Sequence, residues 1–133
     1  MKNLITSLLL LTSFLSYSQE GRKPAVYKAY FLEVSTYNYN TKSFDKLTSD
    51  KVDLLIYFKK GKVEIMDRNS STYYMSGEAK ESVDGTVTTV TYNSYDEQGK
   101  NCDISFMTNS ENNRNFFLVA YDKIFYRYYI EPM

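Results

Sequence analysis

The feature that most constrains the fold is that two successive turns assign the same residues to one face of a strand. Asp84-Gly85 separates two alternating segments, which is typical of a two-residue hairpin. It predicts three pairs: Val83 with Thr86, Ala79 with Val90, and Gly77 with Tyr92. The turn at Asp96–Lys100 predicts a three-residue loop with Gly99 in the left-handed conformation. It pairs Val90 with Phe106, Tyr92 with Ile104, and Ser94 with Cys102. Because side chains alternate with a period of two, both turns place Val90 and Tyr92 on the core face.

Two further hairpins follow from the same parity argument. The turn at Lys59–Lys62 predicts an even loop that pairs Phe58 with Val63 and Ile56 with Ile65. Asp122-Lys123 predicts a hairpin with three pairs: Tyr121 with Ile124, Val119 with Tyr126, and Phe117 with Tyr128. Upstream, Ala25–Tyr37 reads as one strand whose apolar side carries Val26, Tyr30, Leu32 and Val34. Residues 38–51 read as a polar link with Phe44 and Leu47 tucked back, and residues 109–115 as a polar loop.

The sequence therefore predicts an all-β fold with eight strands in chain order. We expect them near residues 25–37, 51–58, 62–68, 72–83, 86–95, 101–108, 116–121 and 124–130. Consecutive hairpins form an antiparallel meander, and eight strands can close into a barrel, so we predict a closed or nearly closed barrel. An open curved sheet and a two-layer sandwich are the alternatives.

The first 18 residues have the features of an export signal. Lys2 supplies the positive charge, an apolar run extends from Leu4 to Leu15, and Ser16-Tyr17-Ser18 places small residues before a cleavage site. We therefore expect a signal peptide at residues 1–18 and a single all-β domain at residues 19–133. A periplasmic or extracellular location is predicted. Charged off-core positions such as Asp53 and Arg127 argue against membrane insertion of the mature chain.

Composition excludes several kinds of site. Lys and Arg number 16 and Asp and Glu number 16, so the chain lacks the positive excess with which proteins bind nucleic acid. It has no His and one Cys, which removes His-based nucleophile pairs and zinc sites built on His or several Cys residues. We predict no cofactor, no metal and no enzymatic activity. The alternative is a hydrolase that uses a carboxylate pair, either Asp53 with Glu64 or Glu78 with Glu81.

The abundance of aromatic residues suggests two kinds of binding site. The first is a tyrosine-lined cavity for a small apolar ligand, with Tyr92, Phe106, Val119, Tyr121 and Tyr126 as its lining. The second is an exposed aromatic patch on the last hairpin for a protein or glycan partner, formed by Phe116, Leu118, Phe125 and Tyr129. The predicted function is an exported, non-enzymatic binding module, with the cavity preferred and the patch as the alternative.

Two resemblances accompany this interpretation. Asp96–Phe106 followed by Tyr121–Ile130 resembles a pattern in short exported proteins of Bacteroidota without an assigned function. This resemblance covers about the last third of the chain, and it implies a bacterial, exported protein with no activity to carry over. The meander also resembles lipocalin-like barrels in architecture, although the early Gly-x-Trp signature of lipocalins is missing because the chain has no Trp.

Overall fold

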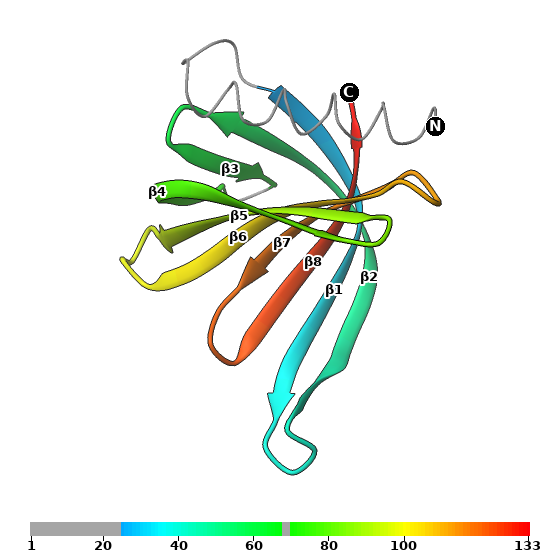
Figure 1. The fold of residues 1–133 in the computed structure, drawn as a ribbon. Helices are drawn as coiled ribbons and strands as arrows, with labels where there is room; N and C mark the ends of the chain where they lie inside the picture. Colours follow the sequence, from blue (N-terminus) through cyan, green and yellow to red (C-terminus); the bar gives the residue numbers. More distant parts are fainter. Residues whose placement is uncertain (1–24, 68–69) are drawn as a thin grey trace.

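The protein is an eight-stranded antiparallel barrel, closed by pairing between its first and last strands (Figure 1). The computed structural model describes residues 25–67 and 70–133, except for the side chain of Leu47. The strands are β1 (Ala25–Asn38), β2 (Ser43–Lys59), β3 (Lys62–Met66), β4 (Ser71–Asp84), β5 (Val87–Asp96), β6 (Asn101–Asn109), β7 (Arg114–Ala120) and β8 (Ile124–Pro132). The predicted signal peptide at residues 1–18 lies outside the described residues. No helix in the described part of the chain is long and apolar enough to cross a membrane.

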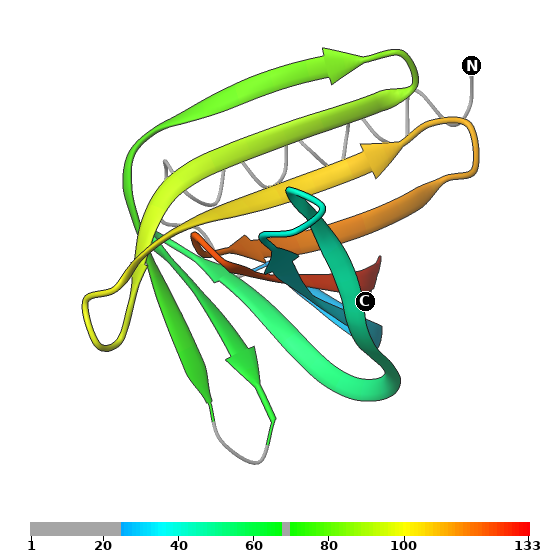
Figure 2. The same ribbon diagram turned by 90° about the horizontal axis from the view of Figure 1, so that it is seen from below.

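Three of the predicted hairpin registers are confirmed. Phe58 pairs with Val63 between β2 and β3, and Val90 pairs with Phe106 between β5 and β6. Val119 pairs with Tyr126 between β7 and β8. Gly99 has a φ of 81°, as the three-residue β5–β6 turn requires. The β5–β6 turn lies at the opposite end of the barrel from the β4–β5 and β6–β7 turns (Figure 2).

The β4–β5 register differs from the prediction near the turn. The two turn residues are Gly85 and Thr86, flanked by the pair Asp84–Val87. Only Gly85 has a positive φ, 60°, which is the geometry of a turn with glycine at its first central position. As a result Val90 pairs with Glu81 instead of Ala79.

A bulge restores the predicted register farther along the same hairpin. Ser76 pairs with Asn93 and Lys80 with Thr91, so three residues, Gly77 to Ala79, lie opposite Tyr92 alone. Gly77 adopts a φ of 78° there. Because the bulge adds two residues, each side chain keeps its face. Ala79 therefore packs against the core that contains Val90 and Phe106, as predicted.

The apolar side of β1 was predicted wrongly in its first half. Tyr27 and Ala29 are buried at 3% and 0% exposure, whereas Tyr30 is 40% exposed. Register shifts toward both neighbouring strands occur between Ala29 and Phe31. This bulge shifts the inward–outward alternation of side chains by one residue, so Leu32 packs against the core. Val26 lies before the bulge and next to the inward-facing Tyr27, so it belongs to the opposite face of the strand.

The predicted polar link at residues 38–51 is mostly strand. Strand β2 begins at Ser43, and β1 and β2 stay paired as far as Asn38–Ser43, extending as a ribbon beyond the barrel (Figure 1). Because its positions are exposed, they do not alternate between apolar and polar residues, and the sequence therefore resembles that of a loop. Phe44 is 47% exposed on this ribbon and contacts the rings of Tyr37 and Phe125, at 5.4 and 6.2 Å between centroids. The predicted loop at 109–115 is also shorter, because β6 and β7 extend to Asn109 and from Arg114.

The centre of the barrel is filled by aromatic rings from separate strands. Phe58 lies 5.2 Å from Tyr27, 6.0 Å from Phe106 and 5.7 Å from Phe117, measured between ring centroids. These four side chains are at most 3% exposed. Edge-to-face contacts of this kind add to the free energy of burial, by about 0.5–1.5 kcal/mol a pair. The aromatic residues therefore serve first to stabilise the barrel.

Candidate functional site

The inward-facing positions become more polar toward the β5–β6 and β7–β8 turns. Along β5 they change from Val90 through Tyr92 to Ser94, and along β6 from Phe106 through Ile104 to Cys102. Toward the β7–β8 turn, Phe117 is followed by Tyr121 on the β7 side, and Ile130 by Tyr128 and Tyr126 on β8. We call this part of the barrel the Tyr121 end. Polar side chains gathered at the mouth of a barrel are a common setting for a ligand site.

Four tyrosines are gathered at the Tyr121 end. Tyr73 and Tyr128 are 9% and 8% exposed, while Tyr121 and Tyr126 are half-buried. Burial raises the pKa of the Tyr73 phenol to about 12, and the nearby Cys102 adds to the effect. Burial also raises the pKa of Tyr121 and of Tyr128. These phenols therefore stay protonated at neutral pH and act as hydrogen-bond donors.

Asp96 ties the β5–β6 turn to Tyr121. Its Oδ1 accepts hydrogen bonds from the backbone N–H groups of Lys100 at 2.9 Å and Gln98 at 3.0 Å. Its Oδ2 accepts a hydrogen bond of 2.8 Å from the Tyr121 hydroxyl. The pKa of the Asp96 carboxyl is lowered, chiefly by the Lys100 N–H and further by the Tyr121 hydroxyl. The Lys100 ammonium lies 5.2 Å from the centre of the Tyr121 ring, so this ring is held on two sides.

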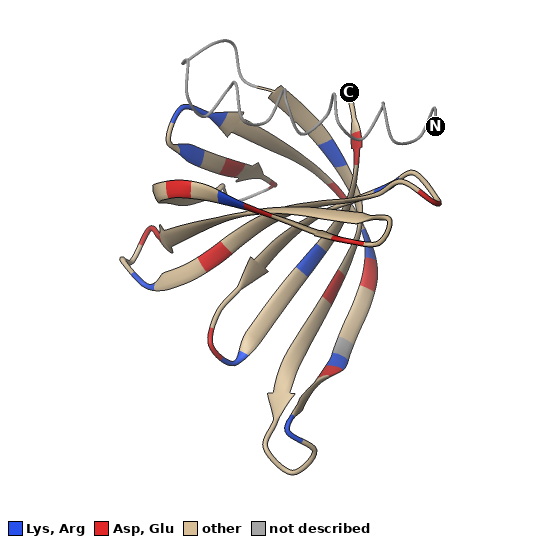
Figure 3. Ribbon diagram, in the orientation of Figure 1, with Lys and Arg blue, Asp and Glu red and all other residues tan. Residues whose placement is uncertain are grey.

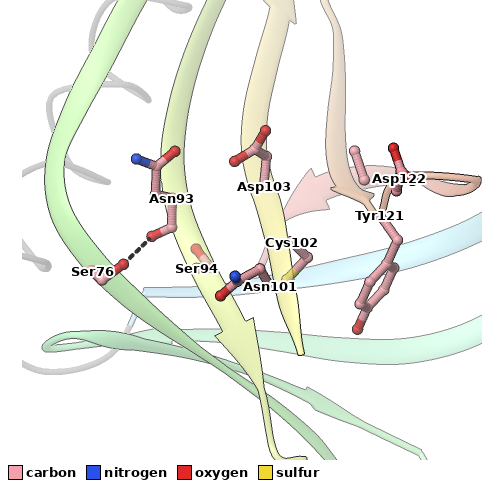
Figure 4. A pocket seen from close by; sticks show the side chains of 9 residues that line it. Ser76, Asn93, Ser94, Asn101, Cys102, Asp103, Tyr121 and Asp122 are labelled. Carbon is pink, nitrogen blue, oxygen red and sulfur yellow. Dashed lines mark hydrogen bonds between the residues drawn. The ribbon is translucent and has the colours of Figure 1, made fainter. Parts of the chain in front are cut away.

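The first hollow at this end, the rim hollow, has a volume of about 470 Å³ and crosses four strands (Figure 4). Its floor includes a cross-strand row of short side chains: Ser76 pairs with Asn93, Asn93 with Asp103, and Asp103 with Ala120. Asn93 and Asp103 are exposed and alternate with buried inward-facing neighbours, so this row lies on the outer face of the sheet. Asn93 and Asp103 lie side by side, and the Ser76 hydroxyl donates a hydrogen bond to the Asn93 carbonyl at 3.1 Å. The other lining residues are Ser94, Asn101, Cys102, Tyr121 and Asp122.

A second hollow, the turn hollow, lies between the start of β4 and the β5–β6 turn. Its volume is about 330 Å³, and its lining residues are Ser70, Ser71, Thr72, Tyr73, Asp96, Glu97, Gln98 and Tyr121. Glu97 bridges the two elements by accepting a hydrogen bond of 2.8 Å from the Thr72 N–H. Tyr121 lines both hollows. Neither is lined by a lysine or arginine of the described residues, so both favour neutral or cationic groups over anions.

The predicted cavity residues occupy two different environments. Tyr92, Phe106 and Val119 are at most 5% exposed and belong to the packed core. They line neither the rim hollow nor the turn hollow. Tyr121 and Tyr126 are half-buried at the Tyr121 end, where Tyr121 forms a wall of both hollows. The structure thus separates the apolar members of the predicted set from its accessible tyrosines.

The predicted exposed patch is covered more than expected, and for Leu118 the prediction was wrong. Leu118 is 4% exposed, and Phe116, Phe125 and Tyr129 are half-buried. Arg127 is the cross-strand partner of Leu118, and its guanidinium carbon lies 5.8 Å from the Phe116 ring centre and 5.5 Å from that of Phe125. The long side chain of Arg127 therefore lies over the apolar outer face of this hairpin.

The carboxylates considered for catalysis are dispersed or paired with lysines. Asp53, Glu78 and Glu81 are exposed. Glu64 forms ion pairs of 2.9 Å with Lys59 and 3.3 Å with Lys62, and its pKa is lowered, chiefly by the hydrogen bond from Lys59. A general acid needs a raised pKa instead. Figure 3 shows acidic and basic positions interspersed over the strands.

Cys102 and the acidic groups offer little for covalent or metal chemistry. Burial raises the pKa of the Cys102 thiol to about 11, with further contributions from Asp96 and Asp103, so it is not an activated nucleophile. Among the residues that the structure describes, no group of three or more acidic or Cys side chains is placed to hold a metal ion.

Several site residues were not singled out from the sequence. Asn93, Asn101 and Asp103 form much of the rim hollow, and Ser70 to Thr72 form one wall of the turn hollow. Asp103 is exposed and lies off the core. The cross-strand row from Ser76 through Asn93 to Asp103 was available from the predicted registers, because Gly77 opposite Tyr92 places Ser76 opposite Asn93. No protein-family model, curated protein or solved structure matches this chain.

Proposed function

We propose that the protein is an exported, non-enzymatic binding module whose ligand occupies the hollows at the Tyr121 end. The observation that carries the proposal is that two hollows lined by hydroxyl, amide and carboxylate groups share the half-buried Tyr121. The export signal predicted at residues 1–18 supports the location. The lowered pKa of Asp96, which lines the turn hollow, is the opposite of what a general acid requires and so supports binding without acid catalysis.

The lining chemistry favours a neutral, hydroxyl-rich ligand such as a saccharide. Asn93 and Asn101 offer both donors and acceptors, and Asp103 and Asp122 offer acceptors, a combination that can pair with neighbouring sugar hydroxyls. The tyrosine ring supplies an apolar surface with a polar tip. A purely apolar ligand would bury these polar groups without partners, which costs about 1–3 kcal/mol for each group. The structure therefore favours a polar ligand over the small apolar one expected from the sequence.

The proposal is tested by titrating the isotopically labelled protein with maltose, chitobiose and galacturonate and following backbone amide shifts by NMR. We expect a neutral sugar to shift Asn93, Asn101 and Tyr121. The variant Asn93→Ala should bind at least about tenfold more weakly, since one or two hydrogen bonds are lost. Asn40→Ala, the same change at an exposed residue in the β1–β2 turn, is the matched control.

Two outcomes would contradict the proposal. One is that none of these sugars shifts residues at the Tyr121 end and that native mass spectrometry of the protein from its source shows no retained ligand there. The other is that Asn93→Ala and Asn40→Ala bind equally well. The export part is tested separately, because cleavage after Ser18 would give a mature chain beginning at Gln19.

A further inference from the structure

A row of aromatic side chains crosses the outer face of the barrel, away from the Tyr121 end. The register pairs Lys51 on β2 with Phe31 on β1, Phe31 with Tyr129 on β8, and Tyr129 with Phe116 on β7. Adjacent strands are about 4.8 Å apart, so the three aromatic positions extend over two spacings, roughly 10 Å, and Lys51 lies one spacing farther. Its length comes from strands that are distant in the sequence and adjacent in the barrel.

The middle of this row is held in place by ring contacts and one hydrogen bond. The Tyr129 ring centre lies 4.8 Å from that of Phe116, 5.2 Å from Phe31 and 6.2 Å from Tyr30, all edge to face. The Tyr129 hydroxyl donates a hydrogen bond to Glu33 Oε1, whose carboxylate also lies 3.8 Å from the Arg127 guanidinium. The negative charge of Glu33 therefore has a cationic neighbour.

Three of these rings, those of Tyr30, Phe31 and Tyr129, form the floor of a groove with a cation at each side. The groove has a volume of about 470 Å³ and is lined by Tyr30, Phe31, Lys51, Arg114 and Tyr129. Lys51 and Arg114 are exposed, and within residues 25–67 and 70–133 neither side chain has an ion-pair partner. Tyr30 is 40% exposed at the β1 bulge, which turns its side chain away from the core. Aromatic surface between two unpaired cations is complementary to a ring-containing anion.

We propose that this outer groove binds an acidic saccharide, with sugar rings on Tyr30, Phe31 and Tyr129 and carboxylates at Lys51 and Arg114. This second site differs from the Tyr121 end in charge, because its charged lining residues are cations and those of the two hollows are acids. An acidic peptide is the other class of anion to consider. A peptide commonly docks on a sheet by adding a strand to a free edge. Phe31 and Tyr129 lie on β1 and β8, which are paired with a strand on each side at these residues, so the floor of the groove is not such an edge. The free edge next to the groove is that of β2 before Leu55, and the test therefore includes a peptide.

The test measures binding of a galacturonate hexamer by calorimetry, at low and high salt, against the same hexamer with its carboxylates methyl-esterified. We expect the acidic hexamer to bind and salt to weaken it. The double variant Lys51→Gln, Arg114→Gln should bind about tenfold more weakly, because it removes both cations. The control is Lys28→Gln with Lys80→Gln, which removes two exposed charges outside the groove. Tyr30→Ala should weaken binding about threefold by removing one ring of the floor.

Three results would overturn this proposal: equal binding of the acid and ester forms, equal binding of the groove and control variants, or tighter binding of polyglutamate than of the saccharide with the same dependence on Lys51 and Arg114. The last result would assign the groove to an acidic peptide. Asn93→Ala should leave this binding unchanged. Failure at the outer groove is thus distinguishable from failure of the function proposed for the Tyr121 end.

Discussion

Two neighbouring phenylalanines on β7 provide a sharp test of the strand register. Phe117 points into the barrel, is 0% exposed, and contacts the rings of Phe58 at 5.7 Å and Tyr128 at 6.2 Å. Phe116 points outward, is half-buried, and contacts Tyr129 at 4.8 Å. The two residues share residue type, strand and sequence neighbourhood, so truncating each to alanine compares the two faces directly.

The expected losses of folding free energy differ, and the loss is larger for Phe117→Ala. Phe117→Ala loses a fully buried ring and leaves a cavity between strands that cannot collapse onto it, which costs about 3–5 kcal/mol. Phe116→Ala loses a partly buried ring on an open face, where solvent or Arg127 can fill the space. We expect about 1–2 kcal/mol, which is part of the transfer free energy of a fully buried phenylalanine. In a domain of this size each kcal/mol lowers the melting temperature by about 4 °C.

The measurement is urea unfolding of both variants and the parent protein, followed by circular dichroism with a second optical probe to check two-state behaviour. Equal free-energy losses for the two variants, or a larger loss for Phe116→Ala, would show that the β7 side chains do not alternate as described. The inward assignment of Val119 and the closure through β8 would then also be wrong.

Two other changes test the turn and the bulge. Gly77→Ala should destabilise the fold by about 1 kcal/mol in the same urea assay, because a residue with a side chain is strained at a φ of 78°. No atom lies within 4 Å of the added methyl group, so a steric clash does not contribute. Gly77→Asn should cost less, and an unchanged stability of Gly77→Ala would contradict the bulge geometry. The lowered pKa of Asp96 means that its carboxylate stabilises the folded state above the pKa of the unfolded chain and that this contribution is lost as the pH falls through the folded-state pKa. Melting temperatures measured from about pH 6 to about pH 2 should therefore fall less steeply for Asp96→Asn than for the parent, and parallel curves would refute the role of the carboxylate.

The sequence predicts most of the fold because the turn residues and the alternation of apolar and polar side chains independently specify the same strand registers. Gly99 and the alternation around Val90 fix one hairpin from both sides, and the observed register agrees. The errors have three sources: a turn shifted by one residue to Gly85-Thr86, a bulge without a sequence signature, and a ribbon without a core face. The bulge at Tyr30 offsets the faces of β1 by one residue, and the ribbon from Ser43 has no core face to reveal it as a strand.

The candidate site was less predictable because it depends on which strands meet. Tyr121 and Tyr126 could be assigned inward from one hairpin. The turn hollow that Tyr121 lines, however, also needs Tyr73, which lies on β4 and is distant in the sequence. The rim hollow exists because short side chains happen to follow one another across four strands. The burial of Leu118 depends on the direction taken by Arg127, a flexible side chain that local patterns do not constrain.

The closure between β1 and β8 has a consequence for how the protein is made. Phe31 pairs with Tyr129, and the Met133 N–H donates a hydrogen bond to the Val26 carbonyl. The pairing of β1 is therefore completed only after β8 has been synthesised. Ribosomal synthesis delivers the chain gradually from one end, so β1 and β2 must remain soluble with one side open until β8 has been made. The charged and hydroxylated residues of the β1–β2 ribbon suit this interval, because an exposed strand edge flanked by lysines is a poor template for aggregation.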